Sequence, residues 1–228
     1  MVKRLIGIGM ICIGFTFMIY HYKEWEMGRS SAQELTEEDL QIYQQEKIQP
    51  ESELKIEENT APTPHKNSIN SQIPSTEVQT SSGEKIGFLV IPKINQKYSL
   101  YWGADKQVLK KGVGLYVSEL TTDPYGGGHT VLSGHRDTVF YRLGELKIGD
   151  QLKVEYGKHM FTYQVKKIWI TDAQDQTVIV KKSEPTLTLT TCYPFNYIGN
   201  APKRYIVQAV FINKSEKIDK RNSHETTS

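Results

Sequence analysis

Cys192 ends a segment whose residue pattern places its thiol on a polar face. The segment from Pro185 to Cys192 alternates threonine with leucine, which predicts a strand over Thr186–Thr191 with one apolar face. Cys192 has the parity of the even-numbered threonines, so its side chain is expected to point away from the core. A lone cysteine is more often an inert buried thiol, but such a residue is expected on the leucine side. The pattern therefore favours a nucleophile.

An arginine begins the next strand-like segment and could assist this thiol. Arg204–Ile212 is predicted as a strand and follows an 11-residue connection, Tyr193–Lys203, which contains two prolines and a glycine. In an antiparallel hairpin, Cys192 would end one strand and Arg204 would begin the next, on the same polar face. A guanidinium can bind a peptide carbonyl, or the oxyanion that forms when sulfur attacks it. A solvated surface charge is the alternative.

A histidine is the third group that thiol chemistry needs. A thiol has a reference pKa of about 8.5, so at neutral pH it requires a base or a cationic neighbour. Three of the six histidines lie in the predicted membrane span, the polar stretch or the C-terminal tail: His21, His65 and His224. Of His129, His135 and His159, we favour His135 because Gly134 leaves room beside it, with His129 as its main competitor. A structural turn histidine is the other interpretation.

Short strands must position these residues. Seven segments have the β-branched and aromatic content of strands: Phe88–Ile91, Lys97–Trp102, Thr130–Ser133, Gln151–Tyr156, Met160–Thr171, Thr186–Thr191 and Arg204–Ile212. Only two segments are predicted as short helices, Asp105–Lys110 and Thr138–Leu143. Many short strands with little helix favour a mainly β fold, a closed or nearly closed β-barrel rather than a sandwich.

The N-terminal region predicts one membrane span. Leu5–Tyr22 contains 18 residues without Asp, Glu, Lys or Arg, which as a helix is about 27 Å long and close to the thickness of the hydrocarbon core. A cleaved signal peptide is the alternative, but its apolar part is shorter, and here the charged Lys23–Glu26 follows. Lys3 and Arg4 precede the span, which predicts a cytosolic N-terminus and a catalytic domain outside. Cys12 is expected to be a small hydrophobic residue within this span.

The distribution of apolar, polar and charged residues along the chain predicts four regions. Residues 1–28 are the N-terminus and anchor, 29–85 a polar and largely disordered stalk with a transient helix over Glu34–Gln49, 86–213 the barrel, and 214–228 a polar tail. The stretch 29–85 carries 11 acidic and 5 basic side chains, whereas residues 86–228 carry 20 basic and 13 acidic ones.

Composition also excludes several classes of protein. Two cysteines exclude a disulfide scaffold, and no closely spaced Cys and His ligands predict a structural zinc. A net charge of +2 gives no indication of nucleic-acid binding. No compact acidic cluster in the barrel segment requires calcium, so no metal or cofactor is expected.

The motifs resemble those of sortases, the cysteine transpeptidases of Gram-positive bacterial surfaces. The resemblance covers roughly residues 87–212 and rests on Thr-Leu-Thr-Thr-Cys ending at Cys192, an arginine 12 residues later, and Ser-Gly-His-Arg-Asp around His135. It implies an eight-stranded β-barrel, with Cys192 as nucleophile, His135 as acid and base, and Arg204 as stabiliser of the substrate and oxyanion. The run Ser-Gly-His-Arg-Asp-Thr-Val-Phe is most similar to class D, the Bacillus type. Substrate contacts are expected from four further residues: Thr190, Thr191, Tyr193 and His129.

The resemblance also implies a reaction and its partners. Such an enzyme cleaves a Leu-Pro-x-Thr-[Gly/Ala] sorting signal after the threonine, through a cysteine thioester, and transfers the protein to an amino group of a peptidoglycan precursor. Residues 5–22 would hold it in the cell membrane. Two alternatives remain: an L,D-transpeptidase-like enzyme, whose Ser-His-Gly-Cys-x-Arg cluster is absent from this sequence, and a non-catalytic surface binding module.

Overall fold

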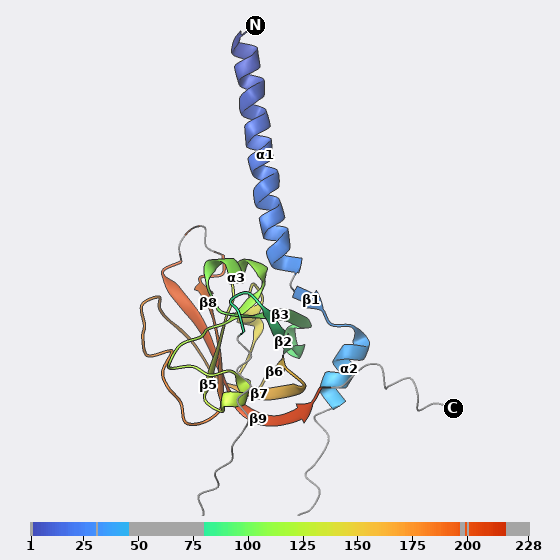
Figure 1. Ribbon diagram of the computed structural model, residues 1–228, viewed down its shortest axis with the longest axis vertical. Coiled ribbons are helices and arrows are strands. Elements are labelled where there is room, and N and C mark those ends of the chain that lie inside the picture. The colour runs from blue at the N-terminus through green and yellow to red at the C-terminus, as the bar shows by residue number, and fades with distance from the viewer. Residues whose placement is uncertain (1, 31, 46–79, 197–198, 200, 218–228) are drawn as a thin grey trace, which may run out of the picture.

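The computed structural model describes residues 2–30, 32–45, 80–196, 199 and 201–217. A long helix, α1 (Val2–Ser30), projects from a small barrel (Figure 1). The other α-helices are α2 (Glu37–Gln45) and α3 (Lys106–Lys111), and the described residues also contain three short 3-10 helices: η2 (Pro92–Ile94), η3 (Pro124–Gly126) and η4 (Leu143–Glu145). The strands are β1 (Ala32–Glu34), β2 (Lys85–Ile91), β3 (Gln96–Trp102), β4 (Val113–Leu115), β5 (His129–Ser133), β6 (Gln151–Tyr156), β7 (His159–Asp172), β8 (Thr186–Tyr193) and β9 (Lys203–Glu216).

Eight of these strands close into a barrel. The strand order is β3-β2-β6-β7-β9-β8-β5-β4, and β4 pairs back onto β3 to complete the ring. Most neighbours are antiparallel, while β3–β4 and β5–β8 are parallel. Strand β1 pairs with the part of β3 that precedes the β4 pairing. The expectation of an eight-stranded, mainly β barrel is therefore confirmed.

The apolar residues of alternating strand positions fill the barrel. Leu187 and Leu189 of β8 are fully buried, as the alternation predicted. They pack in one cluster with residues from the other barrel strands, among them Leu89, Leu100, Leu132, Val154, Val165 and Val207. All seven predicted strands are present, and each observed strand contains its predicted segment or, for β6, coincides with it. The sequence did not predict β1 and β4, which have three residues each.

The two predicted short helices have different outcomes. The first is confirmed as α3, where the Asp105 carboxylate accepts hydrogen bonds from the backbone N–H groups of Gln107 and Val108. The prediction of a helix over Thr138–Leu143 is wrong, because residues 138–142 form turns and only Leu143 belongs to a short 3-10 helix, η4. The Phe140 N–H donates to the His135 carbonyl and the Leu143 N–H to the Phe140 carbonyl, and neither bond has the four-residue spacing of an α-helix.

The start of the predicted stalk packs on the barrel instead of standing free. Helix α2 lies within the predicted Glu34–Gln49 segment, and Leu35 and Tyr43 are buried against Val90 and Met160. The Tyr43 hydroxyl donates a hydrogen bond of 2.7 Å to the Glu155 carboxylate. Helix α2 therefore agrees with the helix expected over Glu34–Gln49, and apolar burial and this hydrogen bond hold it against the barrel. Residues 46–79 of the predicted stalk lie outside the described residues, and its last residue, Lys85, begins β2.

The carboxylate beneath this segment is buried and ionised. Glu155 accepts a hydrogen bond of 2.6 Å from Lys97, and Lys217 lies 3.1 Å from its other oxygen. Burial raises the pKa of Glu155, but the hydrogen bonds from Lys97 and Tyr43 and the two lysine charges outweigh burial and lower it below its ordinary value. The segment 32–45 is therefore bound to the barrel both by the hydrogen bond to the charged Glu155 and by apolar contacts with Val90 and Met160.

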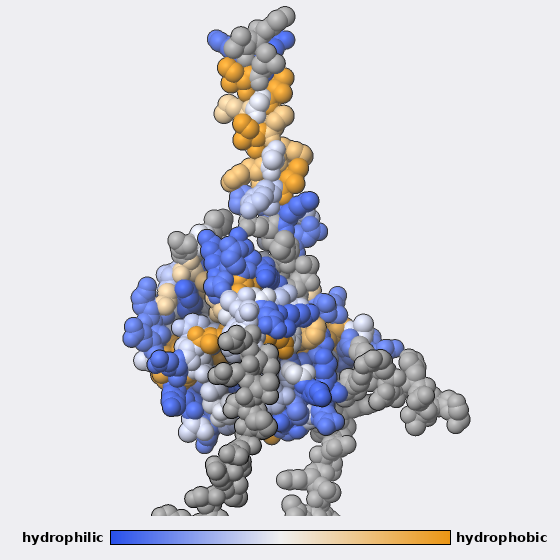
Figure 2. Space-filling model, in the orientation of Figure 1, coloured by the Kyte–Doolittle hydropathy of each residue, from blue (hydrophilic) through white to orange (hydrophobic). Residues whose placement is uncertain are grey.

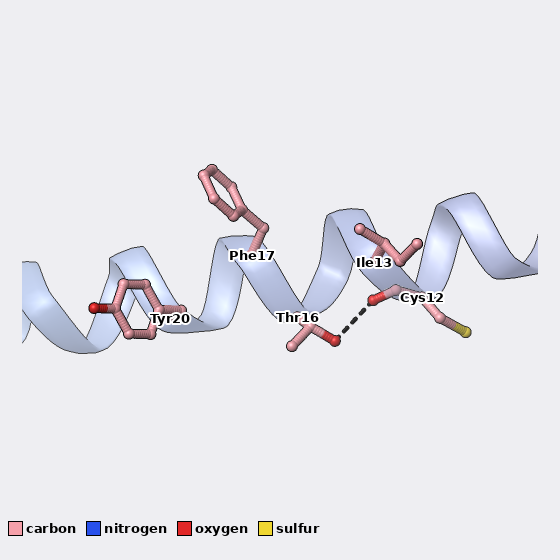
Figure 3. A pocket seen from close by; sticks show the side chains of 5 residues that line it. All are labelled: Cys12, Ile13, Thr16, Phe17 and Tyr20. Carbon is pink, nitrogen blue, oxygen red and sulfur yellow. Dashed lines mark hydrogen bonds between the residues drawn. The ribbon is translucent and has the colours of Figure 1, made fainter.

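Helix α1 has the length and composition of a membrane span. Within it, Ile6–Lys23 has a mean hydropathy of 1.3 and none of its residues is buried. Figure 2 shows an apolar band along this helix, while the visible barrel surface is largely hydrophilic. The Thr16 hydroxyl donates to the Cys12 carbonyl at 2.8 Å, within a shallow hollow on the helix surface that Ile13, Phe17 and Tyr20 also line (Figure 3). This bond satisfies the one hydroxyl in the middle of the span.

Candidate active site

The β8–β9 ladder brings Cys192 and Arg204 together. The two residues are directly opposite partners in the antiparallel register. Directly opposite side chains point to the same face of a sheet, with Cβ atoms about 5 Å apart. Both side chains are half-buried, and neither belongs to the apolar core. The arrangement that parity and the hairpin predicted for this pair is confirmed.

The β5–β8 ladder brings His135 to the other side of Cys192. The last pair in this parallel register is Ser133 with Thr190. The ladder continues past the strand end, because the Gly134 N–H donates to the Thr190 carbonyl at 3.2 Å and the Thr191 hydroxyl donates to the Gly134 carbonyl at 2.7 Å. If this register is extended by two residues beyond the end of β5, His135 comes opposite Cys192. The turn that follows β5 therefore brings the histidine to the end of β8 where Cys192 lies opposite Arg204.

Gly134 is required where His135 leaves the strand. A Cβ atom at this position would lie 2.7 Å from side-chain atoms of both Val139 and Phe140. These two residues are fully buried, and the Phe140 N–H donates to the His135 carbonyl at 2.9 Å. The turn that carries His135 is therefore packed closely onto the barrel core.

Backbone carbonyls of the β8–β9 connection hold two arginines near the site. The Arg204 guanidinium donates through Nη1 to the carbonyls of Ala201, at 3.3 Å, and Lys203, at 3.0 Å. Arg136, next to His135, donates through Nη2 to the Gly199 carbonyl at 2.9 Å. Arg136 therefore links the histidine turn to the connection that precedes Arg204. The sequence analysis did not identify this residue, since its partner is a backbone atom on a distant loop.

Aromatic side chains pack at the end of β8. The ring of Tyr193 is stacked on Tyr205, with centroids 6.1 Å apart, and is edge-on to Phe195 at 5.8 Å. Tyr193 is half-buried, while Phe195 also packs against the barrel core. Burial and the neighbouring Tyr193 raise the pKa of Tyr205. Tyr193 borders the site, so its expected substrate contact stays a prediction.

Of the two threonines expected to contact substrate, only Thr190 is suitably placed. Thr190 shares the face of Cys192 and is half-buried. Thr191 lies on the leucine side, is 2% exposed, and uses its hydroxyl to hold Gly134. The expected substrate contact of Thr191 is therefore corrected to a role in joining β5 to β8.

His129 lies at the opposite end of these strands from Cys192. It pairs with Thr186, six residues before Cys192 on β8. Its side chain is 1% exposed, and both ring nitrogens are engaged, Nδ1 at 2.7 Å from the Val180 carbonyl and Nε2 at 2.8 Å from the Thr188 hydroxyl. Burial lowers the pKa of His129, the bond to Val180 opposes this, and the charge of Lys182 lowers it further. The expectation that His129 binds substrate is wrong.

The even-numbered face of β8 is also less open than expected. Thr188 is fully buried, and Thr186 is 7% exposed. The cover at this end includes the connection 173–185, whose Val180 carbonyl is bonded to His129, which is in turn bonded to Thr188. Only near Thr190 and Cys192 does this face become half-exposed. Among the described residues, no three His, Cys, Asp or Glu side chains gather as a metal site.

Comparison with known proteins agrees with this geometry. Residues 89–212 match the family model described as the sortase domain. The chain is 46% identical to sortase D of Bacillus subtilis (strain 168) over 143 residues, which are 62% of this chain and 71% of that protein.

Solved structures give the same result. The catalytic domain of B. anthracis SrtD is 57% identical, with a TM-score of 0.55, over 64% of this chain and 99% of that one. Sortase C of Clostridium perfringens, solved with the C-terminal cell wall sorting motif, is 30% identical, with a TM-score of 0.52, over 59% of this chain and 74% of that one. The family match covers more than half of the chain and includes Cys192, His135 and Arg204, so this protein belongs to the sortase family of transpeptidases.

Proposed function

We propose that Cys192 is the nucleophile of a membrane-anchored transpeptidase that acts on Leu-Pro-x-Thr-type sorting signals. The observation that carries this proposal is the pairing of Cys192 with Arg204 at the end of β8, together with His135 two residues beyond the end of β5, the strand on the other side of β8. At neutral pH only a few per cent of an ordinary thiol is ionised, so a reactive cysteine needs such neighbours. The half-buried side chain leaves the sulfur within reach of a peptide.

In the first step the Cys192 thiolate attacks the carbonyl carbon of the signal's threonine. The new C–S bond moves the carbonyl electron pair onto oxygen, and the Arg204 guanidinium, with the Tyr193 backbone N–H as a second candidate donor, stabilises the oxyanion. His135, as imidazolium, gives its proton to the nitrogen of the leaving residue. The C–N bond breaks and leaves a thioester on Cys192.

In the second step an amino group attacks the thioester carbonyl. The now neutral His135 takes the proton of this amine, and collapse of the oxyanion expels the Cys192 thiolate. The product carries a new amide bond, and the enzyme is restored. We assign the amine to a peptidoglycan precursor, the acceptor that the family resemblance implies.

The apolar helix supports a location at the outer face of the cell membrane. Ile6–Lys23 is long enough to span the hydrocarbon core, and Lys3 and Arg4 precede it. This arrangement leaves the N-terminus in the cytosol and the barrel outside. The C. perfringens sortase C solved with a cell wall sorting motif supports a sorting signal as the substrate class.

The reaction can be tested with the full chain in detergent micelles. The protein is incubated with a Leu-Pro-x-Thr-Gly or Leu-Pro-x-Thr-Ala peptide and an amine from a peptidoglycan stem peptide, and ligation is followed by mass spectrometry. Wild type is expected to form the new amide, and Cys192→Ala to form none. Cys12→Ala, which removes the thiol of the span, is the matched control and is expected to retain full activity. Ligation by Cys192→Ala would refute the proposal.

A further inference from the structure

We propose that the outward face of α3 binds the anionic headgroups of the membrane in which α1 is anchored, and so fixes the barrel on the membrane surface. Three lysines form this face: Lys106, Lys110 and Lys111. The inference rests on the membrane anchor of the proposed function, but it does not depend on the transpeptidase reaction.

Helix α3 turns its lysines away from the barrel. With about 3.6 residues per turn, Val108 and Leu109 share one side of this helix, and the three lysines lie on the other. Val108 is 2% exposed and belongs to the buried apolar residues, while Leu109 is half-buried. Lys106 and Lys111 are exposed, and Lys110 is half-exposed. The charged face is therefore open to a partner outside the barrel.

Helix α1 brings this face to the membrane. The C-terminal end of α1 lies beside α3, at the end of the barrel from which α1 projects (Figure 1). Figure 2 shows a hydrophilic surface at this end of the barrel, next to the helix that carries the apolar band. Strand β1 begins two residues after α1 ends and is paired with β3. The barrel is thus attached closely to the anchor.

The distance from the span to α3 is short enough for electrostatic attraction. The span ends at Lys23 and α1 at Ser30, which leaves about 10 Å of helix between the hydrocarbon core and the barrel. The headgroup layer of one leaflet takes up about 5–8 Å of this length. The remaining gap is smaller than the Debye length, which is about 8 Å at physiological ionic strength.

The charge at this end of the barrel favours an anionic surface. The segment 80–85 lies against α3, because the Ser82 hydroxyl donates to the Asp105 carboxylate at 2.7 Å and the Lys111 ammonium donates to the Gly83 carbonyl at 3.4 Å. Residues 80–85 and 105–111 together contain four lysines and two carboxylates, a net charge of +2. Residues 23–30 of α1 carry two basic and two acidic side chains. The net positive charge therefore comes from the barrel and not from the end of the anchor.

A weak attraction is enough for this contact, because α1 already holds α3 close to the surface. A contact between two tethered groups forms at a high effective concentration and does not need the affinity of a free ligand. Each lysine near an anionic membrane surface contributes a factor of about five to the binding constant. The contact is therefore expected on an anionic membrane and not on a neutral one.

Acetylation of the full chain in lipid nanodiscs tests the contact in the wild-type protein. Nanodiscs of phosphatidylcholine, with or without the anionic lipid phosphatidylglycerol, are treated briefly with an acetylating reagent, and each lysine is quantified by mass spectrometry. Acetylation of the three α3 lysines is expected to slow about threefold to fivefold in the anionic nanodiscs, and high salt should remove this protection. Equal rates in the two kinds of nanodisc would overturn the proposal.

Lys158 is the internal control for this measurement. It is exposed, and its carbonyl accepts from the Lys217 N–H, which places it beside the end of β9 on the side of the barrel away from α1 (Figure 1). Its acetylation rate is expected to be the same with and without the anionic lipid. A slowing of Lys158 equal to that of the α3 lysines would show a general effect of the lipid and contradict a specific contact.

Two triple variants separate charge from other properties of the helix. The three lysines are all replaced by glutamine in one (Lys106→Gln, Lys110→Gln, Lys111→Gln) and by arginine in the other, and both residues have helix propensities close to that of lysine. A fluorophore on Ser81→Cys, one residue before Ser82, in a chain without Cys12 and Cys192, is quenched at short range by a nitroxide on the lipid headgroups. Quenching in anionic nanodiscs is expected to stay high with arginine and to fall to the level of neutral nanodiscs with glutamine. Equal quenching in the two variants would contradict the proposal.

Two further outcomes identify what has failed. Protection of the α3 lysines by soluble polyphosphate in neutral nanodiscs, with none from phosphatidylglycerol, would assign the face to a soluble polyanion and overturn the proposal. A chain that does not enter neutral nanodiscs at all would refute the anchor and this inference together, whereas entry without protection refutes this inference alone. Because none of these measurements uses a sorting signal, failure of the proposed reaction is recognised separately.

Discussion

The two ends of the β5–β8 strand pair hold histidines in opposite environments. At one end His129 is 1% exposed and bonded through both nitrogens, to Val180 and Thr188. At the other end His135 is half-buried and lies two residues beyond the end of β5, near the end of β8 where Cys192 pairs with Arg204. One ladder thus carries a structural histidine and a candidate catalytic one.

The difference follows from what covers each end. The connection 173–185 lies against β5 and β8 at the His129 end, where Thr188 is fully buried. Near Cys192 the same face is half-exposed, because the connection 173–185 starts at the end of β7, on the side of β9 away from β8. An imidazole whose nitrogens are both satisfied in the protein stabilises the fold, whereas one beside an accessible thiol can move protons.

The largest effect is expected when each of the two histidines is replaced by alanine in turn. His135→Ala is expected to lower kcat/KM about 10²- to 10⁴-fold, since it removes the acid and base, and to leave the melting temperature nearly unchanged. His129→Ala is expected to lower the free energy of unfolding by about 1–3 kcal/mol, because the Val180 carbonyl and Thr188 hydroxyl lose a buried partner. Kinetics and thermal melting of both variants measure this, and a stability loss in His135→Ala that matches that of His129→Ala would remove the distinction.

Substitution of Arg204 is expected to have the next largest effect, on activity and not on stability. Arg204→Ala should lower kcat/KM about 10²- to 10³-fold through loss of oxyanion stabilisation, and Arg204→Lys should restore only part of it, because lysine lacks the forked donors. Lys203→Ala is the matched control, an exposed cation one residue earlier on the opposite face of β9. Full activity in Arg204→Ala with retained circular dichroism would contradict the oxyanion role.

The smallest effect is a pH dependence of stability that arises at the His129 end. The pKa of folded His129 is lowered from its ordinary value of 6.5, so the unfolded chain binds this proton more readily than the folded one. The free energy of unfolding should therefore be highest above pH 6.5 and fall as the pH drops below it, by at most about 1.4 kcal/mol per pH unit for one group. In His129→Asn this slope should be reduced. An unaltered slope would assign the dependence to another group.

The sequence predicted the Cys192 end of the β5–β8 strand pair better than the His129 end. Alternation of leucine and threonine identified the face of Cys192, and a hairpin across Tyr193–Lys203 was enough to place Arg204 beside it. These are local features of two strands. The role of His129 depends on the connection 173–185, which crosses β9 on its way from β7 to β8. The alternation of residues along a strand identifies a face of the sheet, but it does not show which segment covers that face.

The packing of two segments outside the barrel strands was likewise not predictable from the sequence. The segment Thr138–Leu143 has helix-compatible residues, yet it turns so that Val139 and Phe140 both enter the core beside Gly134. The N-terminal segment 32–45 has a polar composition, and only the partners supplied by the barrel, Val90, Met160 and Glu155, explain its packing. Long-range contacts decided both outcomes.

The central claim is that the sulfur between His135 and Arg204 carries the acyl group. The full chain is incubated with a sorting-signal peptide in the absence of an amine acceptor, and the covalent adduct is located by tandem mass spectrometry. We expect an acyl group on the peptide that contains Cys192, which hydroxylamine removes and which Cys192→Ala does not form. Peptide cleavage that proceeds in Cys192→Ala, or an adduct that maps to another residue, would contradict the account.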